Sequence, residues 1–113
     1  MIFFNWDDQQ GEIVLRDYVI EEKTAVHFID SETRDDIDTL SVNLEGTELP
    51  PDRFYVRDYG RYRGLAIALE SHEIAIRVDQ LTVGNWHSTC YEMQAHGELA
   101  ELMQAHHQTR KPT

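Results

Sequence analysis

The chain lacks several features that would narrow its class at once. It has a single cysteine, Cys90, so no disulfide can form within it, and a lone cysteine in a strand-like segment is expected to be a small buried hydrophobe. No apolar run approaches the roughly 18 residues needed to cross a bilayer. The first residues, MIFFNWDD, also lack the basic start of an export signal. We therefore expect a soluble, cytoplasmic protein that makes no contact with a membrane.

Motifs for metal binding, cofactor binding or catalysis are missing as well. The six histidines show no HExxH or paired Cys and His spacing, and Asp30 to Asp38 lacks the glycine and the closing glutamate of a calcium-binding loop. No carboxylate pair stands beside a recognisable nucleophile. Ser71–His72 and His87–Ser88 are adjacent in sequence, which on a strand sends the two side chains to opposite faces. The sequence thus predicts no catalytic residue, no metal, no cofactor and no enzymatic activity.

The chain does contain enough apolar residues for one folded core. Hydrophobic types make up 41% of the 113 residues and often alternate with polar ones from Ile2 to Met103. No repeat, linker or low-complexity segment interrupts this pattern, so we expect a single α+β domain over residues 1–113. The aromatic residues of its strand-like segments are predicted to lie in the core: Phe3, Phe4, Trp6, Phe28 and Trp86.

Negative charge is the strongest compositional feature of the chain. The formal net charge is −11, and residues 1–48 hold thirteen Asp and Glu against three Lys and Arg. Residues 49–113 are almost balanced, with eight acids against seven basic residues. Such a monopole repels nucleic acid and anionic membranes, and it steers a basic partner towards the first half of the chain. The alternative is that the acidity only keeps a small protein soluble.

Alternation of apolar and polar residues predicts most of the strands. Residues 12–20 and 24–29 are rich in β-branched and aromatic types and are predicted to form a hairpin, followed by a strand at 36–44. Further elements are expected as strands at 54–59, 73–83 and 86–92 and as helices at 60–72 and 98–107. We therefore predict a mostly antiparallel sheet of about five or six strands with one central helix and a short C-terminal helix.

Short pieces in the middle of the chain match a known family pattern. They are Val42–Leu44, the turn at Leu49, Val56–Tyr59, and Gly64–Leu65 opening a helix that reaches Leu69. In these pieces the chain resembles a small domain family of unknown function found on phages, plasmids and conjugative elements. That family has acidic or amide residues where Arg61 and Arg63 stand here, so a role carried by that segment does not transfer. The resemblance implies no reaction, but it implies a setting in which small acidic proteins disable host defence, as anti-CRISPR and antirestriction proteins do.

The most acidic segment precedes and enters the strand predicted at 36–44. We predict a partner-binding surface formed by Glu21, Glu22, Asp30, Glu32, Asp35, Asp36 and Asp38. On one face of a strand, Asp36 and Asp38 would stand about 6.7 Å apart, and neighbouring strands about 4.8 Å away would add further charge. One DNA strand presents a phosphate per roughly 3.4 Å, so such a sheet edge could mimic nucleic acid. The alternative is that these charges only prevent edge-to-edge pairing of sheets.

A second segment is basic and aromatic. Its members interleave along residues 53–63: Arg53, Tyr55, Arg57, Tyr59, Arg61, Tyr62 and Arg63. Such a segment can grip single-stranded nucleic acid, but the field of an acidic chain opposes this, so we expect no direct nucleic-acid binding. We predict instead a secondary interaction patch. It either forms salt bridges to Asp52 and Asp58 or meets the acidic half of another copy or of a partner.

Two functional hypotheses follow, the first from the charge asymmetry together with the resemblance and the second from the basic segment facing the acidic half. In the first, the chain is a mobile-element protein that binds and inhibits a basic, nucleic-acid-handling host protein, such as a CRISPR effector or a restriction enzyme. In the second, it is a self-associating structural or regulatory module without enzymatic activity. Such an oligomer would be salt-sensitive, because exposed ion pairs are screened over about 8 Å at physiological ionic strength. The chain is expected to be a monomer or a homodimer.

Overall fold

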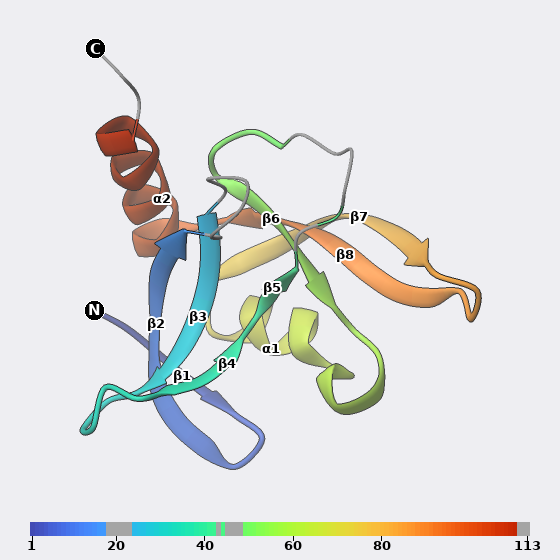
Figure 1. Cartoon of the computed structure of the whole chain (residues 1–113), viewed down its shortest axis with the longest axis horizontal. Helices are drawn as coiled ribbons and strands as arrows, with labels where there is room; N and C mark the ends of the chain where they lie inside the picture. The colour runs from blue at the N-terminus through green and yellow to red at the C-terminus, as the bar shows by residue number, and fades with distance from the viewer. Residues whose placement is uncertain (18–23, 43, 45–48, 111–113) are drawn as a thin grey trace.

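The computed structural model describes residues 1–17, 24–42, 44 and 49–110. Within them the chain forms eight strands, two α-helices and one 3₁₀-helix (Figure 1). The strands are β1 (Ile2–Trp6), β2 (Gln9–Asp17), β3 (Thr24–Asp30), β4 (Asp36–Thr39), β5 (Ser41–Val42), β6 (Arg53–Arg57), β7 (Ala75–Val83) and β8 (Ser88–Ala95). The helices are the 3₁₀-helix η1 (Gly60–Tyr62), α1 (Leu65–Ser71) and α2 (Gly97–Arg110).

The fold is α+β with antiparallel strand pairing, as the sequence predicts, but the strands form two sheets. The first sheet has the order β1-β2-β3-β4 and the second the order β5-β6-β8-β7. The expected hairpin of residues 12–20 and 24–29 corresponds to β2 and β3, which are paired antiparallel. The described strands exceed the predicted number for two reasons. β1 precedes the first expected strand, and residues 36–44 are divided between the two sheets.

The chain passes from the first sheet to the second at Leu40, the single residue between β4 and β5. Leu40 is fully buried, and its N–H donates to the carbonyl of Val26 on β3 at 2.8 Å. The N–H of Val26 in turn donates to Ser41 Oγ, also at 2.8 Å. The Ser41 side chain therefore replaces a ladder bond where the strand turns away, and the buried amide of Val26 keeps a partner.

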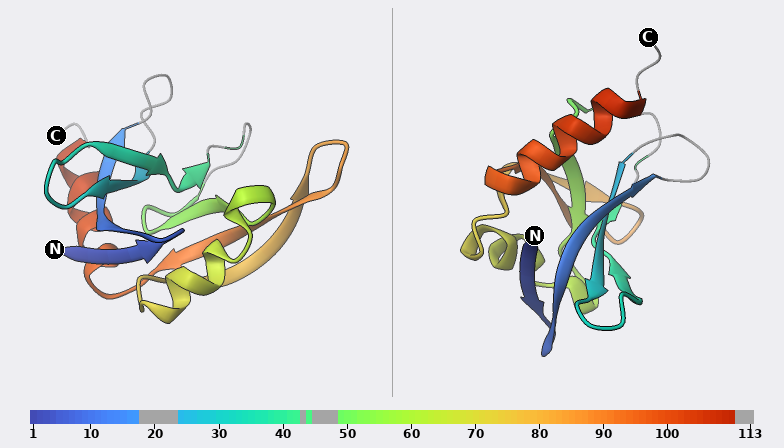
Figure 2. Two further views of the ribbon diagram at one scale, coloured as in Figure 1. Left: turned by 90° about the horizontal axis from the view of Figure 1, so that it is seen from below. Right: turned by 90° about the vertical axis from the view of Figure 1, so that its left-hand side faces the viewer.

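The buried face of helix α1 packs against strands of both sheets (Figure 2). It contacts β1, β6 and β7, and its Leu65 and Leu69 are fully buried. Just beyond its end, the rings of His72 and Phe4 meet edge-on with centroids 5.0 Å apart. Phe4 also packs edge-on against Phe28, at 5.5 Å. One core is therefore continuous from α1 to the first sheet.

Several residues between Val56 and Ala66 have structural roles in this region. Val56 is buried in β6, and Asp58 follows that strand. Asp58 Oδ1 accepts the N–H of Gly64 at 2.9 Å, and Oδ2 accepts that of Ala66 at 3.0 Å. These bonds satisfy free amides at the start of α1. Gly64 has a φ of 88°, a left-handed conformation that favours glycine. The Asp-Tyr and Gly-Leu pairs thus specify how β6 is joined to α1.

Helix α2 is longer than the predicted 98–107 and packs beside the first sheet (Figure 2). It contacts β2, β3 and β8, and it buries Leu99 and Met103 against them. It begins at Gly97, whose φ is 55°. The N–H of the preceding residue, His96, donates to the carbonyl of Ile74. Leu102, on the same helix, remains 40% exposed.

Two of the aromatic side chains predicted in the core are exposed instead. Phe4 and Phe28 are fully buried, and the half-buried Trp6 lies parallel to Phe4 with ring centroids 6.4 Å apart. Phe3 is 63% exposed because it points to the opposite face of β1 from Phe4. Trp86 is 91% exposed because it lies in the turn between β7 and β8 and not in a strand.

Two further predictions concern the burial of Cys90 and the absence of a membrane-spanning helix. Cys90 is buried in β8, as predicted, and burial raises the pKa of its thiol. The thiol is therefore kept in its neutral form and acts as a small apolar side chain. None of the helices within the described residues has the length and apolar character needed to cross a bilayer.

Candidate docking surface

Two turns at one end of the first sheet bring together acids of the N-terminal half. Asp7 and Asp8 form the turn between β1 and β2, and residues 31–35 form the turn between β3 and β4. Because neighbouring strands of this sheet are antiparallel, both turns lie at the same end of it, at the bottom of Figure 1. In a regular sheet, two such turns are separated by two strand spacings, about 10 Å. Acids that are distant in sequence therefore share one edge of the molecule.

Asp30, one of the predicted docking residues, shapes the second of these turns. Its Oδ1 accepts the N–H groups of Glu32 at 2.8 Å and of Thr33 at 2.9 Å. These bonds, the one from Thr33 foremost, hold the pKa of Asp30 below its ordinary value. Its backbone closes the turn, since its carbonyl accepts the N–H of Arg34 and its own N–H donates to the carbonyl of Asp35. Asp30 thus fixes the orientation of its neighbours in this turn.

Arg34, the one basic residue between Asp30 and Asp38, is directed away from the acids beside it. Its backbone is left-handed, with a φ of 67°, and its Nη1 donates to Glu12 Oε2 on β2 at 2.6 Å. The Glu12 side chain is only 6% exposed, so the guanidinium compensates a buried carboxylate. Glu32 and Asp35 are exposed, and Arg34, the nearest cation in sequence, is paired with Glu12 instead of with them.

The two acids of β4 have different surroundings. Asp36 is 57% exposed and lies 3.5 Å from Arg16 Nη2. The Asp38 side chain is only 16% exposed, and it accepts hydrogen bonds from Arg61 at 2.6 Å and from the Tyr62 hydroxyl at 3.0 Å. A register shift in β3 opposite these residues breaks the regular alternation. The expected pair of phosphate-like charges on one strand face is therefore reduced to Asp36.

We call the five exposed carboxylates at this edge the acidic end: Asp7, Asp8, Glu32, Asp35 and Asp36. Asp7 and Asp8 were not among the predicted docking residues, although adjacent acids between two strand-like segments are a turn signal. Both adopt left-handed conformations, with φ values of 52° and 60°. The predicted docking residues Glu21 and Glu22 lie outside the described part of the chain.

The arginines of the predicted secondary patch bond to groups of this same chain. Arg53 donates from Nη1 to Glu92 and from Nε to Gln94, each at 2.8 Å. Arg57 donates from Nη2 to the carbonyl of Thr39 at 3.2 Å. These bonds tie β6 to β8 and to the end of β4, so both arginines contribute to the sheet assembly.

Tyr62 connects the basic patch to the acidic segment. The guanidinium carbons of Arg57 and Arg61 lie 4.1 and 4.8 Å from the centroid of its ring, within the range of a cation–π contact. The hydrogen bond to Tyr62 and the neighbouring Asp38 raise the pKa of Arg61. The two segments singled out in the sequence thus meet inside one chain.

Salt bridges from this patch to Asp52 and Asp58 were expected. Among the described residues, both of these carboxylates bond to other groups. Asp52 accepts a hydrogen bond from Gln94 Nε2 at 2.6 Å, and Asp58 holds the start of α1. Arg63 and Arg61 are exposed at the surface. Tyr62 is buried. The other members are half-buried: Arg53, Tyr55, Arg57 and Tyr59.

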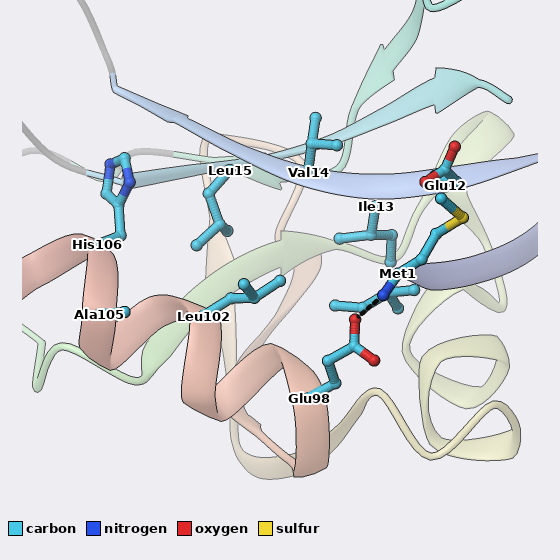
Figure 3. Close-up of a pocket in the computed structure, with 10 residues that line it drawn as sticks. Met1, Glu12, Ile13, Val14, Leu15, Glu98, Leu102, Ala105 and His106 are labelled. Atoms are coloured by element: carbon cyan, nitrogen blue, oxygen red, sulfur yellow. Dashed lines mark hydrogen bonds and ion pairs between the residues drawn. The ribbon is translucent and has the colours of Figure 1, made fainter.

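A second surface feature is an apolar groove between β2 and α2 (Figure 3). We call it the α2 groove; its volume is about 550 Å³. Ile13 and Leu15 of β2 face Leu102 of α2 across it (Figure 3). At one end of it, Glu98 forms an ion pair with the amino group of Met1. The size suits a small ligand or one large side chain.

Groups suited to metal binding do not gather in the part of the chain that the structure describes. No three His, Cys, Asp or Glu side chains there are placed to share a metal ion. Beside the acidic end, a cavity of about 40 Å³ is lined by residues that include Trp6, Asp38 and Arg61. This volume is far below that of ordinary small-molecule sites, about 300–1,000 Å³.

Comparison with known protein families, with curated proteins and with solved structures found no match to this chain. Its function is therefore inferred from the geometry and charge of its own residues.

Proposed function

We propose that the chain binds a basic, nucleic-acid-handling protein through the acidic end and inhibits it by covering the surface that holds nucleic acid. The carrying observation is the exposure of four carboxylates on two turns and of a fifth, Asp36, at the start of β4. Arg16 lies beside Asp36, while Arg34 and Arg61 bond to other acids. The narrower proposal is an inhibitor of a CRISPR effector or a restriction enzyme. This narrower form rests only on the setting that the short resembling pieces between Val42 and Leu69 imply.

The chemistry of the proposed contact is that of phosphate recognition. Arg and Lys side chains that bind phosphate oxygens make the same charge-assisted hydrogen bonds to carboxylates. The net charge of −11 steers such a partner towards this end of the chain before contact. No covalent bond is made or broken in this mode of action. The chain acts by competing with nucleic acid for the same binding surface.

Preorganisation of the turns adds to the affinity expected of this surface. The hydrogen bonds from Glu32 and Thr33 to Asp30 fix one turn before a partner arrives. A surface that is already ordered loses less conformational entropy on binding than a flexible acidic tail does. We therefore expect the acidic end to act as a defined site.

The test compares two charge-matched triple variants with the wild-type chain. The first variant is Asp8→Asn, Glu32→Gln and Asp35→Asn, in the acidic end. The second neutralises three exposed acids elsewhere: Glu73→Gln, Asp79→Asn and Glu101→Gln. Each immobilised chain is incubated with nuclease-treated bacterial lysate, and the bound proteins are identified by mass spectrometry. A DNA duplex is then added as competitor.

The expected result is recovery of a nucleic-acid-handling protein by the wild type and by the second variant, with loss of it in the first. The DNA duplex should displace it, and recovery should fall steeply with salt because the contact is ionic. Equal recovery by both variants, or recovery of the bait alone, contradicts the proposal. Circular dichroism of each variant establishes that the fold is retained.

A further inference from the structure

Seven large apolar side chains are exposed on the described surface: Met1, Phe3, Ile67, Ile76, Val78, Trp86 and Leu102. Three of them lie at opposite ends of the molecule. Met1 and Leu102 line the α2 groove at one end. The most exposed of all, Trp86, lies at the tip of the β7–β8 hairpin. In Figures 1 and 2, α2 and this tip lie at opposite ends of the long axis, which measures 42 Å. A contact between the tip and the groove therefore requires two molecules.

The β7–β8 hairpin forms an arm that extends beyond the second sheet. The pairing of β8 with β6 runs only as far as Cys90, and beyond it the N–H of Asp58 donates to the carbonyl of Thr89. The pairing of β7 with β8 continues to Val83 and Ser88. The last residues of the hairpin therefore have neither α1 nor a third strand beside them (Figure 1).

The arm is held rigidly at both its base and its tip. At the base, Glu70 of α1 accepts the backbone N–H of Arg77 at 3.1 Å and forms an ion pair with its guanidinium at 2.9 Å. At the tip, the N–H of His87 donates to the carbonyl of Gly84. Gly84 and His87 both adopt left-handed conformations, with φ values of 71° and 52°. This closed turn presents Trp86 to solvent.

The arm carries no charged side chain over its outer length. Residues 80–91 contain no Asp, Glu, Lys or Arg, in a chain of which 27% is charged. An uncharged arm can enter an apolar surface without the large cost of desolvating an ion. In a chain of net charge −11, such a segment is also the part best able to approach a second copy.

The α2 groove matches the tip in size and chemistry. Its volume of about 550 Å³ exceeds what one indole ring requires, and Ile13, Leu15 and Leu102 supply apolar walls. The Glu98 carboxylate at one end is an acceptor within the groove, and a buried indole N–H needs one. The groove is thus large enough and apolar enough to receive the uncharged tip.

We propose that the chain forms a homodimer in which Trp86 of each copy occupies the α2 groove of the other. The two copies lie antiparallel, so that each arm reaches the end of the partner that carries the groove. A two-fold axis makes both contacts equivalent and closes the assembly at two copies. This contact uses neither the acidic end nor the basic patch, so it stands independently of the docking function proposed above.

The area of this contact predicts a weak dimer. Burying one tryptophan removes roughly 150–250 Å² from solvent, and a groove that receives one loses a similar area. Each copy therefore contributes about 400 Å², half of the roughly 800 Å² per partner of a standard stable interface. We expect a dissociation constant in the micromolar range or weaker, seen at the protein concentrations of sedimentation experiments.

The test is sedimentation equilibrium of the wild type and of three variants over a range of protein concentrations. Trp86→Ala removes the anchor, and Leu102→Glu places a charge in the groove. Gln104→Glu is the matched control, since it adds the same charge to α2 outside the groove. The first two should raise the dimer dissociation constant at least about tenfold, as expected for a central aromatic anchor, and the third should leave it unchanged.

A mixture tests the two-fold arrangement directly. Trp86→Ala retains an open groove and Leu102→Glu retains its arm, so one of the two contacts can form between the two variants. The mixture should therefore associate more tightly than either variant alone and less tightly than the wild type. Association should change little with added salt, unlike that of a dimer built from the basic patch. A wild type that stays monomeric, a Trp86→Ala variant that dimerises normally, or growth beyond two copies overturns the proposal. Trp86 is 91% exposed, so its replacement leaves the fold intact.

Discussion

Gly11 is a residue at which the fold leaves no space for a side chain. A Cβ atom there would stand 2.1 Å from the carbonyl oxygen of Ile29 and 2.9 Å from the ring of Phe28. The first distance is far shorter than any van der Waals contact, and the neighbour is backbone that is fixed in β3. Gly11 therefore allows β2 and β3 to approach closely next to the acidic turn.

Replacing Gly11 by alanine should destabilise the chain. We expect a loss of about 1–3 kcal/mol in the free energy of unfolding, because the added methyl group forces the two strands apart. Urea unfolding followed by circular dichroism measures this. The control is Gln10→Ala, at the neighbouring exposed position, which should change the stability by less than about 0.5 kcal/mol. A Gly11→Ala variant as stable as the wild type would contradict the close approach of the strands.

Single residues also show what the sequence could and could not predict. The burial of Cys90, Phe4 and Phe28 follows from their residue type and strand-like surroundings, and the structure agrees. The pairing of Arg34 with Glu12 spans 22 positions and depends on which strands are neighbours. Nothing local marks this pairing, so from the sequence alone Arg34 is expected to offset the acids beside it, whereas it compensates Glu12.

At the scale of elements, the connection from β6 to α1 depends on one carboxylate. Asp58 accepts the N–H groups of Gly64 and Ala66, and so closes the 3₁₀ turn back onto the helix that follows. Helix α1 has only seven residues, too few to be stable by itself in water. Its position between β1 and β7 therefore relies on this cap and on the burial of Leu65 and Leu69.

Replacing Asp58 by alanine should loosen α1. We expect a loss of about 0.5–2 kcal/mol, as for a side-chain N-cap, because Asp58 satisfies the amides of the N-cap residue Gly64 and of Ala66. Amide hydrogen exchange should show faster exchange at Gly64 and Ala66 than in the wild type. Asp58→Asn retains an acceptor oxygen and serves as the control, with a smaller loss expected. Unchanged exchange at both amides in the alanine variant would show that α1 does not depend on the cap.

The elements themselves were only partly predictable. The antiparallel pairing of β2 with β3 and the presence of two helices follow from apolar periodicity and turn signals. The division of residues 36–44 into β4 and β5 could not be predicted in this way. The alternation of apolar and polar residues continues unchanged through Leu40, where the chain leaves one sheet for the other. The change of sheet is set by the Ser41 side chain and by the backbone of Val26, a contact across 15 positions.

At the scale of the whole molecule, the acidic end places like charges together and opposes folding. Two unit charges about 10 Å apart in water repel by about 0.4 kcal/mol, and the five carboxylates form several such pairs. A surface of this kind lowers stability unless it has another use. Docking gives it one use, and prevention of edge-to-edge pairing by β4, an edge strand of its sheet, gives it another.

The triple variant Asp8→Asn, Glu32→Gln, Asp35→Asn distinguishes these two uses. Relief of repulsion should raise its unfolding free energy by about 1–2 kcal/mol at low ionic strength, and salt should shrink the gain as the charges are screened. If the charges serve docking, the variant remains monodisperse in light scattering and loses only its partner. If they protect β4, the variant aggregates, while the variant neutralised at Glu73, Asp79 and Glu101 does not. Aggregation confined to the acidic-end variant, with partner recovery unchanged in its remaining monomer, would therefore contradict a docking role.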